Sequence, residues 1–306
     1  MAHDKLLGIY WDSGKPALHT RQHDQPGLAL GTGIYLSLGL SGVRHCIGYY
    51  DEALDTRQNC QDNREMEAGR ESQCIRCQHD GGTFAAKSGI ADSLRGNQLL
   101  SAQHDVYLAL FGKDVVKVGV TRSSRREVRL LEQAAHASII IASGDGEAAR
   151  VLERQIHTQA GLPETIKLAT KLEKLTTVAT PDEANRILLE TTELVRSQVA
   201  STLPSLDTDF TYHFPRYDVR LPSDLTSLRY IDRLDDEAVV SGRLVGALGR
   251  CLLLHNGVDE KVYALDSVLI EGYEADTQLQ QNQAIESRVT GVHAKHIDLY
   301  QQGSLF

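Results

Sequence analysis

The segment spanning residues 104–162 limits the possible fold of this chain more than any other. Two apolar runs, residues 106–111 and 115–120, are separated by a short glycine-containing turn, which predicts a β-hairpin. A third apolar run, residues 137–142, predicts a buried strand, and residues 147–160 predict a helix that stops at a glycine. The order strand, strand, loop, strand, helix predicts a small α+β unit.

The loop that follows the second predicted strand is strongly basic. Between Lys113 and Arg129 the chain has six basic residues and two acidic ones, whereas the net charge of the whole chain is −9. The basic residues are Lys113, Lys117, Arg122, Arg125, Arg126 and Arg129. A local excess of positive charge on an acidic protein predicts a site for phosphate groups, and therefore a nucleic-acid partner, either DNA or RNA.

Four of the five cysteines lie in a polar stretch that has few apolar residues for a core of its own. They are Cys46, Cys60, Cys74 and Cys77, and the last two form a Cys-x-x-Cys motif. Four thiolates can surround one Zn²⁺ tetrahedrally, and the bound ion stabilises a segment that has little core. We therefore expect a structural zinc site, in which His45 or His79 could replace one cysteine. The alternatives are a redox motif or unrelated cysteines. For Cys251, in an apolar run, we expect the role of a small buried hydrophobe.

The second half of the chain predicts a helix and then strands. Thr180-Pro181-Asp182-Glu183 has the pattern of a capping box and predicts the start of an amphipathic helix. Asn256-Gly257 predicts a hairpin turn between strands. The predicted strands cover residues 238–249, 250–255 and 261–270. The glutamine-rich residues from Glu274 onward are expected to be loosely ordered at first.

The expected architecture is an α+β chain in four segments. These are a β-rich, zinc-stabilised unit over residues 1–100, a small antiparallel sheet with helices over 101–165, a helical segment over 166–205 and a β-rich unit over 206–306. The most apolar window, residues 27–40, is short and broken by glycines, so no membrane-spanning helix is predicted. The N-terminal residues lack the pattern of a signal peptide. We therefore expect a cytoplasmic protein without structural disulfides.

The order of elements over residues 104–162 resembles the GIY-YIG nuclease fold. By this resemblance Tyr107 takes the place of the first tyrosine, and Lys117-Val118-Gly119 takes the place of the second triplet. Arg129 best matches the catalytic arginine, with Arg126 as the alternative, and Glu153 matches the metal-binding glutamate. The chain departs from the family pattern because Lys117 replaces the second tyrosine.

A wider part of the chain resembles a bacterial and archaeal family known as "domain of unknown function 2797". The cysteine-bearing N-terminal unit, the Val-Tyr-Leu-Ala and Lys-Val-Gly-Val-Thr-Arg motifs and the late glycines Gly242, Gly246 and Gly249 carry this resemblance. It covers most of the chain, and it implies an architecture but no activity.

Together the residues and the resemblance predict a metal-dependent phosphodiesterase or endonuclease that acts on nucleic acid. Glu153 would hold Mg²⁺ or Mn²⁺, Arg129 would stabilise charge on the phosphate, and Tyr107 would position or deprotonate water. Lys117 would bind phosphate as a point charge, and His104 could assist as a base. The alternatives are an inactive, zinc-containing module that binds nucleic acid and a structural or regulatory protein that binds other proteins.

Overall fold

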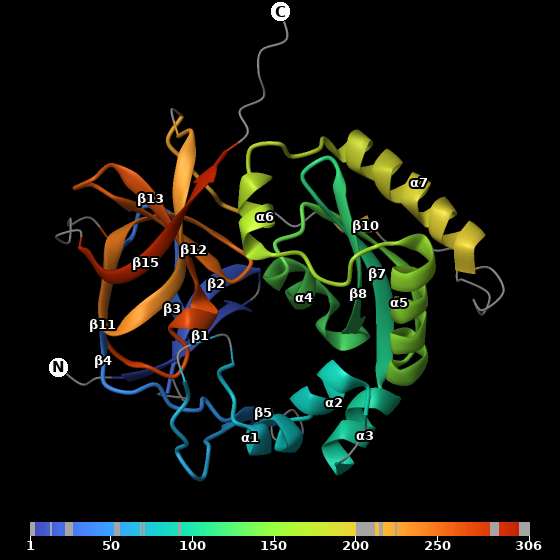
Figure 1. Cartoon of the computed structure of the whole chain (residues 1–306), viewed down its shortest axis with the longest axis horizontal. Helices are drawn as coiled ribbons and strands as arrows, with labels where there is room; N and C mark the ends of the chain where they lie inside the picture. The colour runs from blue at the N-terminus through green and yellow to red at the C-terminus, as the bar shows by residue number, and fades with distance from the viewer. Residues whose placement is uncertain are drawn as a thin grey trace, which may run out of the picture. The chain divides into compact units, whose positions relative to one another are not determined.

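The structure is a computed structural model of the chain. It describes residues 4–12, 14–21, 27–51, 56–67, 69, 71–90, 93–199, 212–213, 217–223, 225–281 and 288–299. The described residues form more strand than helix, which confirms the mixed α+β class. They belong to two compact units (Figure 1). Unit 1 combines Met1–Gly81 with Tyr217–Asp298, and unit 2 contains Gly82–Arg216 and Leu299–Phe306.

Unit 1 is built on a large sheet that joins the two ends of the chain. Among the described residues the sheet has nine strands in the order β12-β13-β11-β4-β14-β1-β2-β3, with β15 paired to β11. The strands are β1 (Asp4–Asp12), β2 (Lys15–Thr20), β3 (Leu28–Ala29), β4 (Tyr35–Ser41), β11 (Ser227–Leu248), β12 (Cys251–Asn256), β13 (Lys261–Asp266), β14 (Glu274–Gln280) and β15 (Val289–Asp298). The N-terminal strand β4 pairs with β11 on one side and with β14 on the other.

The strand β14 corrects one expectation. Residues from Glu274 were expected to be loosely ordered, yet β14 lies between β1 and β4 in the sheet, and Ala275 is 1% exposed. Backbone hydrogen bonds to both neighbours order this segment despite its glutamines, because pairing on both sides satisfies its main-chain groups. By contrast, the expected hairpin at Asn256-Gly257 is confirmed, since β12 and β13 are antiparallel and Asn256 pairs with Lys261.

A cysteine-bearing segment of unit 1 lies outside the large sheet. It contains the short strands β5 (Tyr49–Asp51) and β6 (Thr56–Gln58), which pair with each other, and the helix α1 (Ile75–Asp80). Its buried residues are mainly the cysteines themselves, with Tyr49 and Met66 packed against them. The segment therefore has little apolar core, as its composition predicts.

Unit 2 is centred on a four-stranded sheet of order β10-β9-β7-β8. Its strands are β7 (Gln103–Phe111), β8 (Val115–Arg122), β9 (Ala137–Asp145) and β10 (Tyr212–His213). Its helices are α2 (Thr83–Ser88), α3 (Leu94–Ser101), α4 (Arg126–Glu132), α5 (Gly146–Ala160), α6 (Leu168–Glu173) and α7 (Pro181–Val199). The expected hairpin is confirmed: β7 and β8 are antiparallel, and Tyr107 pairs with Gly119.

The two faces of the unit 2 sheet have separate cores. Helices α5 and α7 cover one face, where Leu108 of β7 packs with Leu152 and Leu188 (Figure 1). The other face carries Tyr107 and Phe111 and packs against Leu130 of α4. Residues on alternate positions of β7 therefore serve different cores, as the two-residue period of a strand requires.

Two helix starts in unit 2 have the caps that the sequence predicts. Asp145 caps α5 by accepting a hydrogen bond from the Ala148 amide at 2.8 Å. The capping box before α7 is also confirmed, because the Thr180 amide donates to the Glu183 carboxylate at 2.8 Å and the Glu183 amide donates to Thr180 Oγ1 at 3.3 Å. In the described part of the chain no helix is long and apolar enough to span a membrane.

Candidate metal centre and candidate phosphate site

The four cysteines of the polar stretch converge in unit 1. The sulfur atoms of Cys46, Cys60, Cys74 and Cys77 all lie within 4.8 Å of one another. Cys60 Sγ and Cys74 Sγ are 3.8 Å apart. Sulfur atoms bound tetrahedrally at about 2.3 Å from a zinc ion would lie about 3.8 Å from one another. The four cysteines could therefore hold a metal ion, and neither His45 nor His79 belongs to the group.

The backbone around Cys46 forms a tight turn that directs N–H groups at the sulfur. The amides of Gly48 and Cys74 donate to Cys46 Sγ at 3.4 and 3.2 Å. Gly48 has a φ of +72°, and a Cβ at this position would lie 1.9 Å from the Gln58 carbonyl oxygen. Only glycine fits this turn, so the local fold around Cys46 depends on Gly48.

The surroundings of the thiols shift their pKa values in different directions. Burial raises the pKa of Cys46 and of Cys77, and repulsion from Cys46 adds to the effect at Cys77. Cys60 is half-buried; burial opposes its ionisation, but N–H donors from Arg64 and Asp62 hold its pKa below the usual value. Four thiols this close cannot all ionise without a cation, and a bound divalent ion would supply that charge. Cys251 is buried in β12 away from this group, as expected.

In unit 2 the structure brings together four of the predicted site residues. Arg129 on α4 and Glu153 on α5 lie close enough to Tyr107 on β7 and Lys117 on β8 to affect the pKa of both. Lys117 and Tyr107 share a face of the sheet, and the Lys117 ammonium lies 5.6 Å from the centre of the Tyr107 ring. We call Tyr107, Lys117, Arg129 and Glu153 the unit 2 cluster.

Tyr107 is almost wholly enclosed within this cluster. It is 1% exposed, and burial raises the pKa of its phenol to about 12 even though Arg129 opposes the shift by charge and by a hydrogen bond. Its ring lies over Gly119, where a Cβ would come within 2.5 Å of the ring carbon Cζ and the phenol oxygen. The glycine of the Lys-Val-Gly triplet therefore leaves space for the tyrosine ring.

Lys117 and Glu153 are buried charges with few partners. Lys117 is 5% exposed and donates to the Glu164 carbonyl oxygen at 3.1 Å. Burial lowers its pKa to about 8, and repulsion from Arg129 adds to the shift. Glu153 is 7% exposed and accepts from Arg150 at 3.0 Å, and burial raises the pKa of its carboxyl despite this pair. Perturbed buried groups that face one another are typical of functional sites, although structural ion pairs also produce them.

The two candidate arginines on α4 differ in their partners. Arg126 donates to the Asp105 carboxylate at 2.7 Å, and Asp105 also accepts from Ser123 and Ser143 at 2.9 and 2.7 Å. Arg129 instead lies close enough to Tyr107 to oppose the rise in the Tyr107 pKa that burial causes, and it pairs with Glu132 at 3.4 Å. The geometry places Arg129, and not Arg126, in the unit 2 cluster.

His104 does not reach the unit 2 cluster. It lies an odd number of residues from Tyr107 along β7 and on the opposite face of the sheet, where it packs beside Gly146. It is 5% exposed, and its Nδ1 is 2.8 Å from the Ala102 carbonyl oxygen. This position fits a buried packing histidine.

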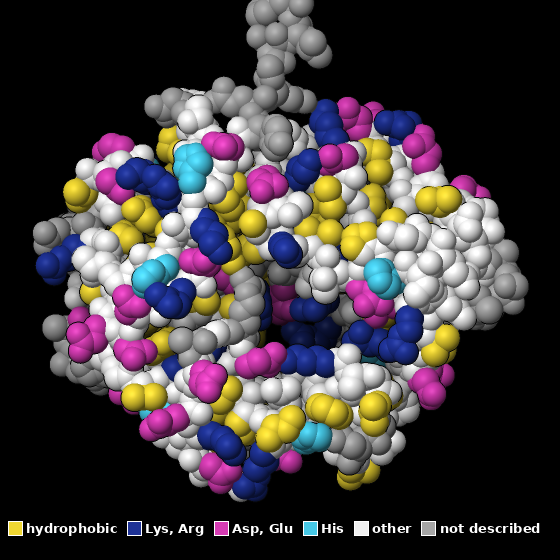
Figure 2. All heavy atoms as spheres, viewed as in Figure 1, with side chains coloured by type: hydrophobic (Ala, Val, Ile, Leu, Met, Phe, Trp, Pro, Cys, Tyr) yellow, Lys and Arg dark blue, Asp and Glu magenta, His cyan; other side chains and the backbone are white. Residues whose placement is uncertain are grey.

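Several basic residues of the predicted phosphate patch have acidic partners outside the segment from Lys113 to Arg129. Arg125 pairs with Glu132 at 3.0 Å, and Lys113 pairs with Glu183 at 3.2 Å. Over much of the face that Figure 2 draws, Lys and Arg side chains are interspersed with Asp and Glu. Arg122 is likewise not without a partner, and burial lowers the pKa of its guanidinium. The local charge sum therefore overstates the positive charge that is available.

Two further residues matter here: Asp105, which the sequence analysis did not single out, and Arg150, which the sequence offers as a helix partner of Glu153. Asp105 is fully buried and anchors Arg126, while Arg150 pairs with Glu153 and also donates to the Ala86 carbonyl. A charged residue within an apolar strand was the available signal for Asp105. The spacing of three residues on one helix was the signal for the pair of Arg150 with Glu153.

A comparison with family models places the chain in one family. The model described as "Protein of unknown function (DUF2797)" matches residues 33–275, which is most of the chain and includes the four cysteines and the unit 2 cluster. The chain belongs to this family. No curated protein and no solved structure matched the chain.

Proposed function

We propose that unit 2 is a divergent GIY-YIG-type phosphodiesterase that acts on nucleic acid. The observation that carries the proposal is the convergence of Tyr107, Lys117, Arg129 and Glu153 from four separate elements. These are the residues that the resemblance to the GIY-YIG nuclease fold assigns to a phosphodiester-cleaving site. A cation, a phenol and a carboxylate near one another are suited to hold a phosphate group and a metal ion.

The metal requirement of this proposal fits the chain with one condition. Mg²⁺ commonly binds to one or two protein carboxylates and completes its shell with water and substrate phosphate. Glu153 can supply such a carboxylate, provided that the metal displaces Arg150 from it. A bound Mg²⁺ or Mn²⁺ would supply positive charge to the reacting phosphate, while Arg129 would orient the same phosphate.

We further propose that the metal at the four cysteines is structural zinc. The soft sulfur ligands, the tetrahedral spacing and the weak core of this segment all favour zinc with a role in folding. Four protein ligands leave no open position for a substrate, so we assign no catalysis to this ion.

A binding module without cleavage is the second candidate. Tyr107 and Lys117 are 1% and 5% exposed, and Glu153 is already paired with Arg150. A site closed to this extent favours a protein that keeps the fold and the basic residues but does not admit a scissile phosphate. The experiment described next distinguishes the two candidates.

The test uses the full-length, metal-loaded chain with labelled single- and double-stranded DNA and RNA. Cleavage is measured with Mg²⁺ and with Mn²⁺, and binding is measured by fluorescence anisotropy over a range of salt concentrations. The variants are Arg129→Gln and Glu153→Gln, because glutamine at position 153 can still accept a hydrogen bond from Arg150. Glu147→Gln is the matched control, since Glu147 is exposed on the same helix.

Metal-dependent cleavage that is lost in Glu153→Gln, with binding retained, supports the phosphodiesterase. Salt-dependent binding without cleavage by any metal-loaded sample supports the second candidate. A chain that neither binds nor cleaves any of the four nucleic acids overturns both, and the structural or protein-binding role then remains.

A further inference from the structure

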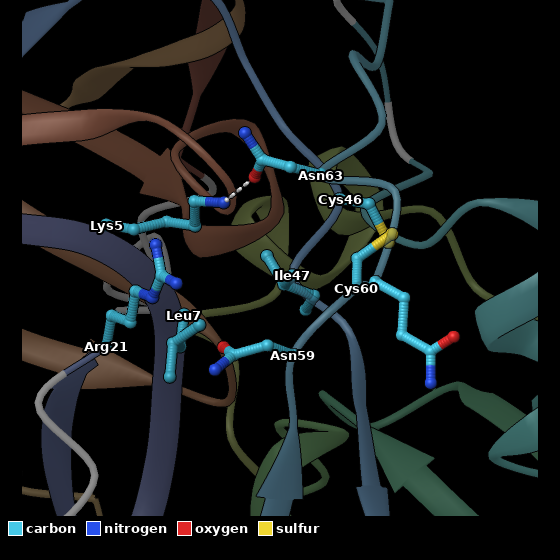
Figure 3. Close-up of a pocket in the computed structure, with 9 residues that line it drawn as sticks. Lys5, Leu7, Arg21, Cys46, Ile47, Asn59, Cys60 and Asn63 are labelled. Atoms are coloured by element: carbon cyan, nitrogen blue, oxygen red, sulfur yellow. Dashed lines mark hydrogen bonds between the residues drawn. The ribbon is translucent and has the colours of Figure 1, made fainter.

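A pocket in unit 1 borders the proposed zinc site at Cys46 and Cys60 and extends beyond it. Its volume is about 340 Å³, and it is lined by nine residues. They are Lys5, Leu7, Arg21, Cys46, Ile47, Asn59, Cys60, Gln61 and Asn63. Figure 3 shows that Lys5, Leu7 and Arg21 come from the side of β1 and β2, while the cysteines and asparagines come from the facing loops. The pocket is of a size that can hold a small ligand.

Two positive charges lie on the β1 and β2 side of this pocket. The Arg21 amide donates to the Lys5 carbonyl oxygen at 2.9 Å, so the two residues are held side by side as β2 ends. Burial lowers the pKa of Lys5, and the nearby Arg21 lowers it further, which shows that the two cations repel each other. Lys5 is only 8% exposed, whereas Arg21 is exposed. The fold therefore holds the buried Lys5 ammonium beside the Arg21 guanidinium. A bound anion would reduce the repulsion between these two cations.

The remaining polar lining consists of neutral amides. The Lys5 ammonium donates to Asn63 Oδ1 at 2.9 Å (Figure 3). An ammonium has three donors, and within the described part of the chain Asn63 is its one hydrogen-bonded acceptor. Asn59 adds a further N–H donor, whereas Gln61 accepts from Arg76 at 2.6 Å, and no Asp or Glu is among the lining residues. The lining thus offers donors and positive charge to a ligand that carries acceptors.

Cys46 and Cys60 form the opposite end of the pocket. As thiolates they attract Lys5, and Glu274, which pairs with Lys5 between β1 and β14, does so as well. An anion would therefore bind at the end formed by Lys5, Arg21 and the amides, away from the sulfur atoms. The end of the pocket at Lys5 and Arg21 is therefore the favourable end for an oxyanion.

We propose that this pocket binds a phosphate group at Lys5 and Arg21, with the amides of Asn59 and Asn63 as additional donors. The phosphate can be free inorganic phosphate or the phosphate of a small monoester, and both share the same chemistry of recognition. This site is separate from the unit 2 cluster, and its existence does not depend on cleavage by unit 2.

The test is calorimetric titration of the full-length, zinc-loaded chain with inorganic phosphate and, separately, with a nucleoside monophosphate. Arg21→Gln removes one cation at an exposed position, where misfolding is not expected. Lys5→Met removes the buried cation and keeps the length of the side chain. Lys15→Met is the matched control, because Lys15 is an exposed lysine on β2 that does not line the pocket. Zinc content is measured for every variant.

We expect both ligands or one of them to bind, and each pocket variant to weaken binding by about tenfold or more with zinc content unchanged. Binding of the monoester alone identifies an ester as the ligand, and binding of both identifies the phosphate group itself. Lys15→Met should bind as the wild type does. The proposal is overturned if the wild type binds neither ligand or if Arg21→Gln binds as tightly as the wild type. It is also overturned if the pocket variants lose zinc while their zinc-loaded fraction binds phosphate normally, because the cations would then serve only to balance the thiolates.

Discussion

The ring of Tyr107 lies against the backbone of Gly119 on the neighbouring strand, so that a Cβ at position 119 would meet the Tyr107 ring and phenol oxygen at 2.5 Å. The two residues pair directly across β7 and β8. Packing therefore explains why a glycine occupies position 119 within a strand. The aromatic ring of Tyr107 fills the space that a side chain at position 119 would need.

Gly119→Ala should destabilise unit 2 because the ring of Tyr107 must move from a fully buried position. We expect a loss of about 1–3 kcal/mol in the free energy of unfolding, measured by urea denaturation. Gly144→Ala is the control, since a Cβ there has its nearest neighbour at 3.7 Å, an ordinary contact. Equal stabilities of the two variants would contradict the close packing of Tyr107 on Gly119.

Asp105→Asn should also destabilise unit 2, because Asp105 is fully buried and binds Arg126, Ser123 and Ser143. We expect a loss of about 2–4 kcal/mol near neutral pH. Burial disfavours the charged form, but the three hydrogen-bonding partners still hold the pKa of Asp105 below 3.8. The stabilisation is therefore complete above the ordinary pKa and is lost as the pH falls through the lowered one.

The difference in unfolding free energy between wild type and Asp105→Asn should accordingly shrink when the pH is lowered below about 4. Urea denaturation at a series of acidic pH values checks this. A difference that stays constant over that range would show that the Asp105 charge does not stabilise the folded state.

Lys117→Met should stabilise the chain at pH 7, because it removes a buried charge. The pKa of Lys117 is lowered from 10.5 to about 8 by burial and by Arg129, so the folded state binds this proton less tightly than the unfolded chain. The destabilising effect of the charge is complete below pH 8 and disappears as the pH rises toward 10.5. We expect Lys117→Met to gain about 1–3 kcal/mol at pH 7.

The advantage of Lys117→Met should become smaller between pH 8 and pH 10, as urea denaturation of both proteins would show. Lys167→Met, at an exposed position in the same unit, should have little effect at either pH. An advantage that grows with pH would mean that the ammonium of Lys117 stabilises the fold.

Removal of the metal should unfold the cysteine-bearing segment of unit 1, because that segment has little apolar core. Freshly purified protein should contain stoichiometric zinc, and Cys77→Ser should lose it, whereas Cys251→Ser should keep it. Elemental analysis measures the zinc, and limited proteolysis before and after chelation measures the unfolding. Wild-type protein without bound zinc would contradict the assignment.

The parts of the structure that depend on local pattern were predictable from the sequence. The hairpin of β7 and β8, the helix α5, the capping box at Thr180 and the grouping of the four cysteines each follow from spacing over short stretches. The cysteines were predictable because a polar segment needs a cross-link in order to fold. Tyr107 and Lys117 share a face because the hairpin register pairs Tyr107 with Gly119, two residues from Lys117.

The features that depend on partners distant in sequence were not predictable. The glutamine-rich sequence of β14 does not indicate a strand. The segment is ordered because it pairs with β1 on one side and β4 on the other. The acidic partners of Lys113 and Arg126 are Glu183 and Asp105, which lie 70 and 21 residues away, so the charge of the basic segment could not be judged from its own residues. The phosphate pocket joins Lys5 and Arg21 to a loop near residue 60, which no motif indicates.

The most direct test of the central claim is the rate of cleavage of a labelled nucleic acid under single-turnover conditions with Mn²⁺, for the wild type and for Glu153→Gln. We predict that the wild type cleaves and that Glu153→Gln is slower by about a hundredfold or more, while both bind the nucleic acid equally. No cleavage by the wild type, or equal rates for the two proteins, would contradict a phosphodiesterase site at Tyr107, Lys117, Arg129 and Glu153.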